Sequence, residues 1–224
     1  MSFETFAERF VGQYNLFLLA LIGKYMMARA RRVTAGDIVR FQTDGFALGR
    51  AFSDAAKALI EEYASSLTSE PNGDELAVLR VQRQRIDAYV TVAIGEGIET
   101  LARALFLSSV TTSINTPGMK ALQSKQLDDP QFLLRDSADR RWDARKLMRA
   151  VARDFAYQTL IRYQVAEARR TGETQAMVTY PDANHADNGM LFSLENSAAM
   201  PTFNDIEASI FHPNSTATVT HVHA

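Results

Sequence analysis

The sequence predicts an α+β fold that is mainly α, with long N-terminal helices, a basic central helix and a small C-terminal antiparallel β region. Three observations lead to this expectation. Apolar residues recur at helical spacing through about the first 110 residues. An Arg-rich segment with one apolar side follows at 141–171, and short β-favouring runs between Pro, Asn, Asp and Gly occupy 173–224. We therefore expect a helical domain at 1–117 and a second region at 118–224.

The N-terminal segment predicts a helix that is buried in protein. Its uninterrupted apolar run, Leu16 to Ile22, is far shorter than the ~20 residues that a membrane-spanning helix needs. Glu4 and Glu8 lie where a secretory signal would carry positive charge. An alternative interpretation is a docking helix that inserts between subunits or meets a membrane, because Met26, Met27 and the segment Arg29 to Arg32 suit a partner surface.

Two further long helices are expected before the Arg-rich segment. Thr34, with Asp37 three residues later, resembles a capping box that begins one of them. The turn residues at 69–74 separate it from the next helix, which we expect at 75 to about 107. Residues 118–135 predict one short helix and a loop.

The charge of the chain is concentrated in one segment. The net charge of -2 argues against a protein that coats nucleic acid over its whole surface. The segment from Arg135 to Arg170, however, contains ten Lys or Arg residues and five Asp or Glu residues, which gives it a local charge of +5. The chain has no Cys, which excludes disulfides and thiol chemistry.

The basic helix is expected at 141–171. On a 3.6-residue repeat its apolar side contains Ala144, Leu147, Met148, Val151, Phe155, Val165 and Ala166, and Arg145, Lys146, Arg149 and Arg153 lie roughly opposite. These four cations are candidate phosphate contacts. Trp142 and Tyr163 are candidates for stacking on bases. The alternative is an ordinary solvated helix face, and the helix lacks the spacing of sequence-specific DNA-binding motifs.

All four histidines lie near the C-terminus, and several carboxylates lie near them: His185, His212, His221 and His223, with Asp182, Asp187, Asp205 and Glu207. A small metal-dependent hydrolase built on this His/Asp cluster is therefore the alternative function. The segment contains no His-Glu-x-x-His helix and no nucleophile elbow. We expect instead that His185 and His212 hydrogen-bond the turns of the sheet, and that the chain uses no metal, cofactor or catalytic residue.

Motifs in about the last 90 residues resemble one protein family. They are Arg140-Arg141-Trp142, Asp182 to His185, Asn188-Gly189 followed by Phe192-Ser193-Leu194, and His212-Pro213-Asn214. In this order, after a basic helix, they resemble the head-morphogenesis proteins of the phage Mu F type, which are minor capsid proteins of tailed phages. Many members carry Cys just after the Pro-Asn pair, where this chain has Ser215.

The resemblance implies a structural protein of the virion. It places the chain inside the phage head near the portal after assembly in the host cytoplasm, aiding head assembly and genome delivery. The implied partners are the portal protein, the major capsid protein, or both, with several copies per virion and contact with a membrane only during ejection. Packaged DNA is then the polyanion for the basic helix, and the motif residues have structural roles.

Overall fold

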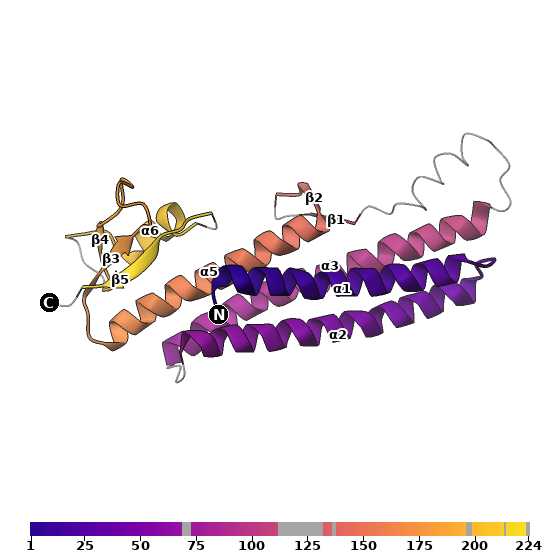
Figure 1. Ribbon diagram of the computed structural model, residues 1–224, viewed down its shortest axis with the longest axis horizontal. Helices are drawn as coiled ribbons and strands as arrows, with labels where there is room; N and C mark the ends of the chain where they lie inside the picture. The colour runs from indigo at the N-terminus through magenta and orange to yellow at the C-terminus, as the bar shows by residue number, and fades with distance from the viewer. Residues whose placement is uncertain (69–72, 112–131, 136–137, 196–198, 213, 223–224) are drawn as a thin grey trace. The chain divides into compact units, whose positions relative to one another are not determined.

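The computed structural model describes residues 1–68, 73–111, 132–135, 138–195, 199–212 and 214–222. Its helices are α1 (Phe3–Arg29), α2 (Ala35–Leu67), α3 (Gly73–Thr111), α5 (Ala144–Arg170) and α6 (Phe203–Ile210), as Figure 1 shows. Its strands are β1 (Leu133–Arg135), β2 (Arg141–Asp143), β3 (Gln175–Thr179), β4 (Leu191–Ser193) and β5 (Thr218–His221). The predicted α+β, mainly α fold is confirmed. The helix and loop expected at 118–135 lie largely outside the described residues, as does the expected boundary at residue 117.

The chain folds into two compact units, and each draws on separate segments of the sequence. One, here called the C-terminal unit, comprises Met1–Ala7, Glu61–Arg85 and Ala152–Ala224. The other, here called the helical unit, comprises Glu8–Ile60 and Ile86–Val151. In the part of the chain that the structure describes, no helix is long and apolar enough to cross a membrane.

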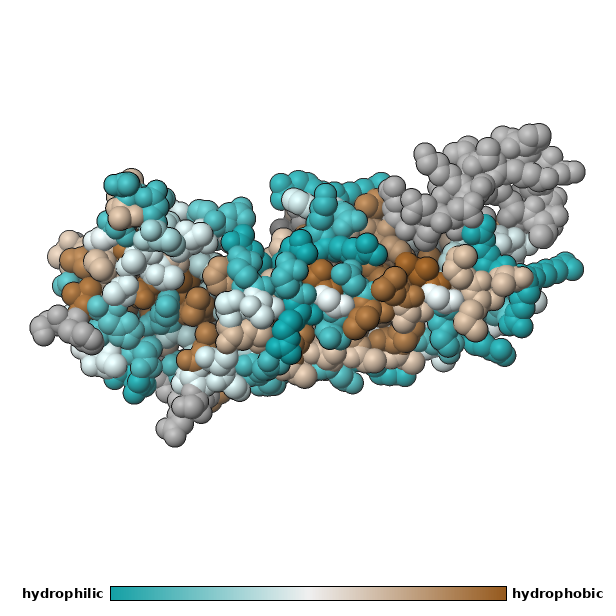
Figure 2. All heavy atoms as spheres, viewed as in Figure 1, coloured by the Kyte–Doolittle hydropathy of each residue, from teal (hydrophilic) through white to brown (hydrophobic). Residues whose placement is uncertain are grey.

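In the helical unit, α1, α2 and α3 run side by side (Figure 1). Aromatic rings of α1 and α2 form part of the core, with Phe17 and Phe52 stacked at 5.7 Å between ring centroids. Gly45 of α2 lets neighbouring side chains approach closely, because a Cβ there would lie 3.0 Å from Ile98 Cγ1 and 3.2 Å from Leu21 Cδ1. The face of α1 seen in the middle of Figure 2 is also apolar.

The predicted start of α2 is confirmed in atomic detail. The backbone N–H of Asp37 donates to Thr34 Oγ1 at 3.3 Å, and the N–H of Thr34 donates to the Asp37 carboxylate at 3.0 Å. These reciprocal bonds are a capping box with Asp in place of Glu. The hydrogen bonds from Thr34 lower the pKa of Asp37.

Strands β1 and β2 correct two expectations. The helix predicted at 141–171 begins three residues late, at Ala144, and ends at Arg170. The strands are not confined to the region after Gly172, because β2 pairs antiparallel with β1 and places Trp142 opposite Leu134. Pairing with a strand eight residues upstream commits the backbone of residues 141–143 to a ladder, so it is not available to the helix.

Both ends of α5 have local causes. The Asp143 carboxylate accepts the backbone N–H groups of Arg145 at 3.1 Å and Lys146 at 3.0 Å, so Asp143 caps the helix. At the other end Gly172 has a φ of +82°, and its N–H donates to the Arg169 carbonyl at 3.1 Å. A left-handed glycine that closes the last turn is a frequent helix end, and here it follows a helix that ends within one residue of the predicted end at 171.

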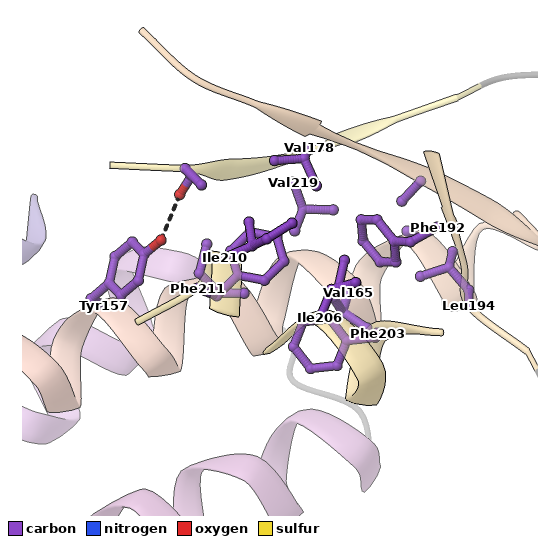
Figure 3. Packing of buried hydrophobic residues seen from close by; sticks show 14 residues of the cluster. Tyr157, Val165, Val178, Phe192, Leu194, Phe203, Ile206, Ile210, Phe211 and Val219 are labelled. Atoms are coloured by element: carbon purple, nitrogen blue, oxygen red, sulfur yellow. Dashed lines mark hydrogen bonds between the residues drawn. The ribbon is translucent and has the colours of Figure 1, made fainter. Parts of the chain in front are cut away.

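The C-terminal unit contains the predicted small antiparallel sheet, with strand order β4-β3-β5. The sheet and α6 pack on α5 around one apolar core (Figure 3). That core comprises Tyr157, Ile161, Val165, Ala168, Ala176, Val178, Phe192, Leu194, Phe203, Ile206, Ile210, Phe211, Ala217 and Val219. Three of its aromatic rings, Phe192, Phe203 and Phe211, lie between 5.7 and 6.2 Å from one another.

Candidate functional site

The four cations predicted as phosphate contacts have different surroundings. Arg145, Lys146 and Arg149 are exposed and belong to the helical unit, whereas Arg153 belongs to the C-terminal unit. The guanidinium of Arg149 lies 3.1 Å from the Glu8 carboxylate. Arg153 lies 3.0 Å from the carboxylate of Glu4, and its guanidinium lies over the ring of Phe3. Two of the four cations therefore already have carboxylate partners within their own units.

Arg145 and Lys146 occupy the first turn of α5. The partial positive charge of a helix N-terminus disfavours cations there by about 0.3–1 kcal/mol each. The first turn also contains no acidic residue, and Asp143 just ahead of it is the cap. Helix stability therefore does not explain these two cations, whereas a phosphate bound by their side chains would be favoured by both positive charges.

Of the two rings predicted to stack on bases, one is accessible. Trp142 is 38% exposed on β2, and the guanidinium of Arg140 lies 5.6 Å from the centre of its ring. Tyr163 is only 4% exposed, so the expectation that it stacks on bases is wrong. Burial raises the pKa of Tyr163, and the nearby charge of Glu75 raises it further. Arg141, beside Trp142 on β2, is exposed.

Asn188 and Gly189 build the connection between β3 and β4. The Asn188 side-chain oxygen accepts the Tyr180 N–H at 2.9 Å, and its amide nitrogen donates to the Ala183 carbonyl at 3.3 Å. Gly189 has a φ of +84°, a conformation that favours glycine, and its N–H donates to the Val178 carbonyl at 2.9 Å. Both residues therefore fix the path of the chain between two strands.

Asp182 and His185 organise the same loop. The Asp182 carboxylate accepts the Asn184 N–H at 3.0 Å, a turn that its side chain closes locally. Nδ1 of His185 accepts the Asp187 N–H at 3.3 Å. The His185 ring also stacks on Tyr180, with 3.6 Å between ring centroids and 13° between planes. The imidazole thus bonds a turn, as predicted.

The segment around His212 has a similar arrangement. Nδ1 of His212 accepts the Asn214 N–H at 3.3 Å, and the His212 carbonyl accepts the Ser215 N–H at 2.8 Å. Ser215 is 4% exposed, and its hydroxyl accepts the Ala217 N–H at 3.0 Å. Pro213 of this motif lies outside the described residues.

The two remaining histidines are His221 and His223. Nδ1 of His221 lies 3.2 Å from the Glu173 carboxylate, and His223 lies outside the described residues. Within the described segments, no three His, Cys, Asp or Glu side chains form a group that could hold a metal ion. The described imidazoles of the expected His/Asp cluster therefore have separate neighbours: Asp187, Asn214 and Glu173.

Sequence reasoning missed a polar cavity of about 500 Å³ in the C-terminal unit. Its lining residues are Leu67, Thr68, Glu75, Leu160, Tyr163, Gln164, Glu167, Arg170 and His221. Glu75 is 1% exposed, and the hydrogen bond from Arg170 lowers the pKa of Glu167. The residues come from the end of α2, the start of α3, α5 and β5, so no local motif identifies them.

The chain matches none of the known protein-family models, no curated protein and no solved structure. The expected resemblance to the phage Mu F type therefore rests on the motif residues alone, whose positions are given above. In the C-terminal unit the described members of those motifs are turn-forming and core residues, such as Asn188, His185 and Phe192.

Proposed function

We propose that the chain is a structural minor head protein of a tailed bacteriophage, associated with the portal and the packaged DNA. One observation carries this proposal. The polar motif residues of the C-terminal unit direct their side chains to backbone groups of their own turns, as Asn188, His185 and His212 do. Side chains that bond the backbone of their own turns fix the shape of a folded surface.

The same bonds weigh against a hydrolytic role for the motif. Nδ1 of His185 and Nδ1 of His212 each accept a backbone N–H, and the buried hydroxyl of Ser215 accepts another. A general base or nucleophile must instead present its atom to substrate within hydrogen-bond reach. The motif side chains therefore support the shape of the unit, which is what a head component requires of them.

The proposed partners follow from the resemblance and from the charge of α5. Arg145 and Lys146 are the proposed contacts to DNA, with Trp142 near them in the sequence. The portal protein, the major capsid protein, or both are the proposed protein partners, in a virion that contains several copies. The proposed location is the interior of the head near the portal.

Purified particles provide the test. Quantitative mass spectrometry should find the protein in mature particles in few copies relative to the major capsid protein. Gold-labelled antibody should mark one vertex, and a tagged chain should co-purify with the portal protein when the head genes are expressed together. Absence from purified particles, or a distribution over the whole shell in stoichiometric amounts, contradicts the proposal.

A further inference from the structure

From Gly12 onward, helix α1 is apolar on both of its sides. One side fills the core of the helical unit with Phe10, Tyr14, Phe17, Leu18, Leu21 and Tyr25. The opposite side is exposed and contains Gly12, Leu16, Leu19, Ala20, Gly23, Met26 and Met27, here called the α1 stripe. The exposed fractions of its four large side chains are 61% for Leu16, 61% for Leu19, 54% for Met26 and 73% for Met27. Figure 2 shows the apolar surface that gathers over α1.

The α1 stripe contains no charged residue. From Gly12 to Ala28 the only charged residue of the helix is Lys24, whose ammonium lies 2.9 Å from the Asp44 carboxylate. A helix that is apolar all round is typical of one buried on all sides. A contiguous apolar patch of this kind on a folded unit marks an interaction site.

Among the described residues, no close packing accounts for two glycines of the stripe. A Cβ added at Gly12 or Gly23 would meet no atom of the described residues within 4 Å. By contrast, a Cβ at Gly45 of α2 would lie 3.0 Å from Ile98 Cγ1, so that glycine serves close packing. Gly in a helix interior costs about 1 kcal/mol relative to Ala. Gly12 and Gly23 thus fit a surface that another helix approaches closely.

We propose that the α1 stripe pairs with the α1 stripe of a second copy of this chain, with the two helices antiparallel. An antiparallel register sets Leu19 against Ala20 of the second copy. The same register sets each large residue of the outer pairs against a glycine: Leu16 against Gly23 and Met27 against Gly12. A two-fold axis repeats every contact on the other side, as a self-complementary interface requires. Large residues opposite small ones let the two helices interdigitate.

The charges at the end of α1 favour the antiparallel orientation. Lys24, Arg29, Arg31 and Arg32 follow one another with no acidic residue between them. A parallel pair would bring these two cationic ends together, whereas an antiparallel pair holds them at opposite ends of the interface. Antiparallel helices also place each positive helix terminus near a negative one. The pairing stands independently of the phage function proposed above.

The first test is the mass of the full chain in solution, measured by sedimentation equilibrium. The wild-type chain should form a dimer. Leu16→Glu places a charge opposite Gly23 of the second copy, within the apolar interface, and should weaken the dimer about 100-fold or more. Val92→Glu is the matched control, since Val92 is a 50% exposed apolar residue of α3, and it should leave the dimer unchanged. Circular dichroism should show equal helix content in both variants.

Gly23→Leu separates dimer loss from misfolding. Leu is a better helix former than Gly, so the substitution should raise the stability of the folded chain while its bulk weakens the dimer. A general folding defect would lower both. Retention of a wild-type dimer by both Gly23→Leu and Leu16→Glu would overturn the proposed interface.

Cysteine cross-linking tests the register, because the chain has no Cys of its own. Mixing the Leu16→Cys and Gly23→Cys variants under oxidising conditions should give a disulfide-linked dimer. Either variant alone should not, because two copies of residue 16 would lie about 10 Å apart along the helix axis, too far for a disulfide. Linking of Leu16→Cys to itself would show a parallel pair and overturn the orientation.

Further measurements on the same variants would show whether something other than a second copy covers the α1 stripe. A wild-type chain that stays monomeric at every concentration contradicts the proposal. If such a monomer binds vesicles of anionic phospholipid and Leu16→Glu does not, the stripe meets lipid. If it instead binds purified portal protein through the same residue, the stripe is a portal-binding surface and no second copy occupies it.

Discussion

The guanidinium of Arg149 on α5 lies 3.1 Å from the carboxylate of Glu8 on α1, although 141 residues separate the two along the chain. This contact changes what the basic helix presents to a polyanion. Arg149 already has an acidic partner, whereas Arg145 and Lys146 lie one turn earlier, in the first turn of α5. Both side chains of the Arg149–Glu8 pair are more than half exposed, so the pair is weak and a phosphate can compete for the arginine.

We predict weak DNA binding without sequence preference, and a defined response to loss of Glu8. If Arg145 and Lys146 neutralise two phosphates, log affinity should fall against log salt with a slope of about -2 on duplex DNA. Glu8→Gln releases Arg149 and should steepen that slope by about one. Fluorescence anisotropy of a labelled duplex over a series of salt concentrations measures both slopes.

The controls for this prediction reverse charge in matched places. Arg145→Glu together with Lys146→Glu should abolish binding. Arg103→Glu reverses an exposed cation of α3 in the same unit and should leave binding nearly unchanged. Binding that ignores salt, or that survives the double substitution, contradicts a role for the start of α5.

The features that sequence reasoning predicted correctly have local causes. The Thr34 and Asp37 capping box joins residues three apart, and Gly172 closes the turn immediately before it. The expected start of the basic helix was wrong because residues 141–143 pair with the preceding strand β1. The apolar side of the helix begins at Ala144 in the sequence as well, because Arg140 and Arg141 occupy the preceding positions of that side.

In the candidate site, too, features with partners near in sequence were predictable, and features with distant partners were not. The turn roles of His185 and His212 depend on amides two residues away and were predictable. The burial of Tyr163 depends on segments distant in sequence, as does the cavity that it lines with Glu75 and His221. No spacing rule connects residues 75, 163 and 221, so only the folded chain identifies them.

Asn188→Ala should destabilise the C-terminal unit by about 1–3 kcal/mol, because the Tyr180 N–H and the Ala183 carbonyl lose their partner. Hydrogen exchange should accelerate at the Tyr180 amide in particular. Asn188→Asp keeps the oxygen that accepts the Tyr180 N–H and should cost less. Asn204→Ala, at an exposed position of α6, should change stability by no more than about 0.5 kcal/mol. Equal effects of the two alanine variants would refute the role assigned to Asn188.

Phe192→Ala and Leu191→Ala test the orientation of β4. Adjacent residues of a strand point to opposite faces, and here Phe192 is fully buried whereas Leu191 is 42% exposed. Phe192 contacts Phe203 and Phe211, so its loss should cost about 3–5 kcal/mol in urea unfolding. Leu191→Ala should cost less than about 1 kcal/mol. The reverse order would mean that the strand register is shifted by one residue.

The last prediction concerns Asp154, whose pKa is raised because burial penalises its charged form, although the charge of Arg85 at 3.3 Å lowers it in part. A carboxyl whose pKa is higher in the folded state than in the unfolded state binds protons more tightly when folded. Its contribution to stability is therefore largest below the ordinary carboxyl pKa. That contribution is lost as the pH rises through the window between the ordinary pKa and the raised one.

Asp154→Asn removes this titration and should flatten the dependence of stability on pH in that window. Above the window the Asn variant should be at least as stable as the wild type, because no charge is buried. Asp205 is the matched control with the opposite sign, since hydrogen bonds from Thr202 lower its pKa. Asp205→Asn should therefore lose stability above the ordinary carboxyl pKa. Urea unfolding across a pH series measures both variants, and a loss of stability in Asp154→Asn at neutral pH would mean that the Arg85 ion pair outweighs the cost of burial.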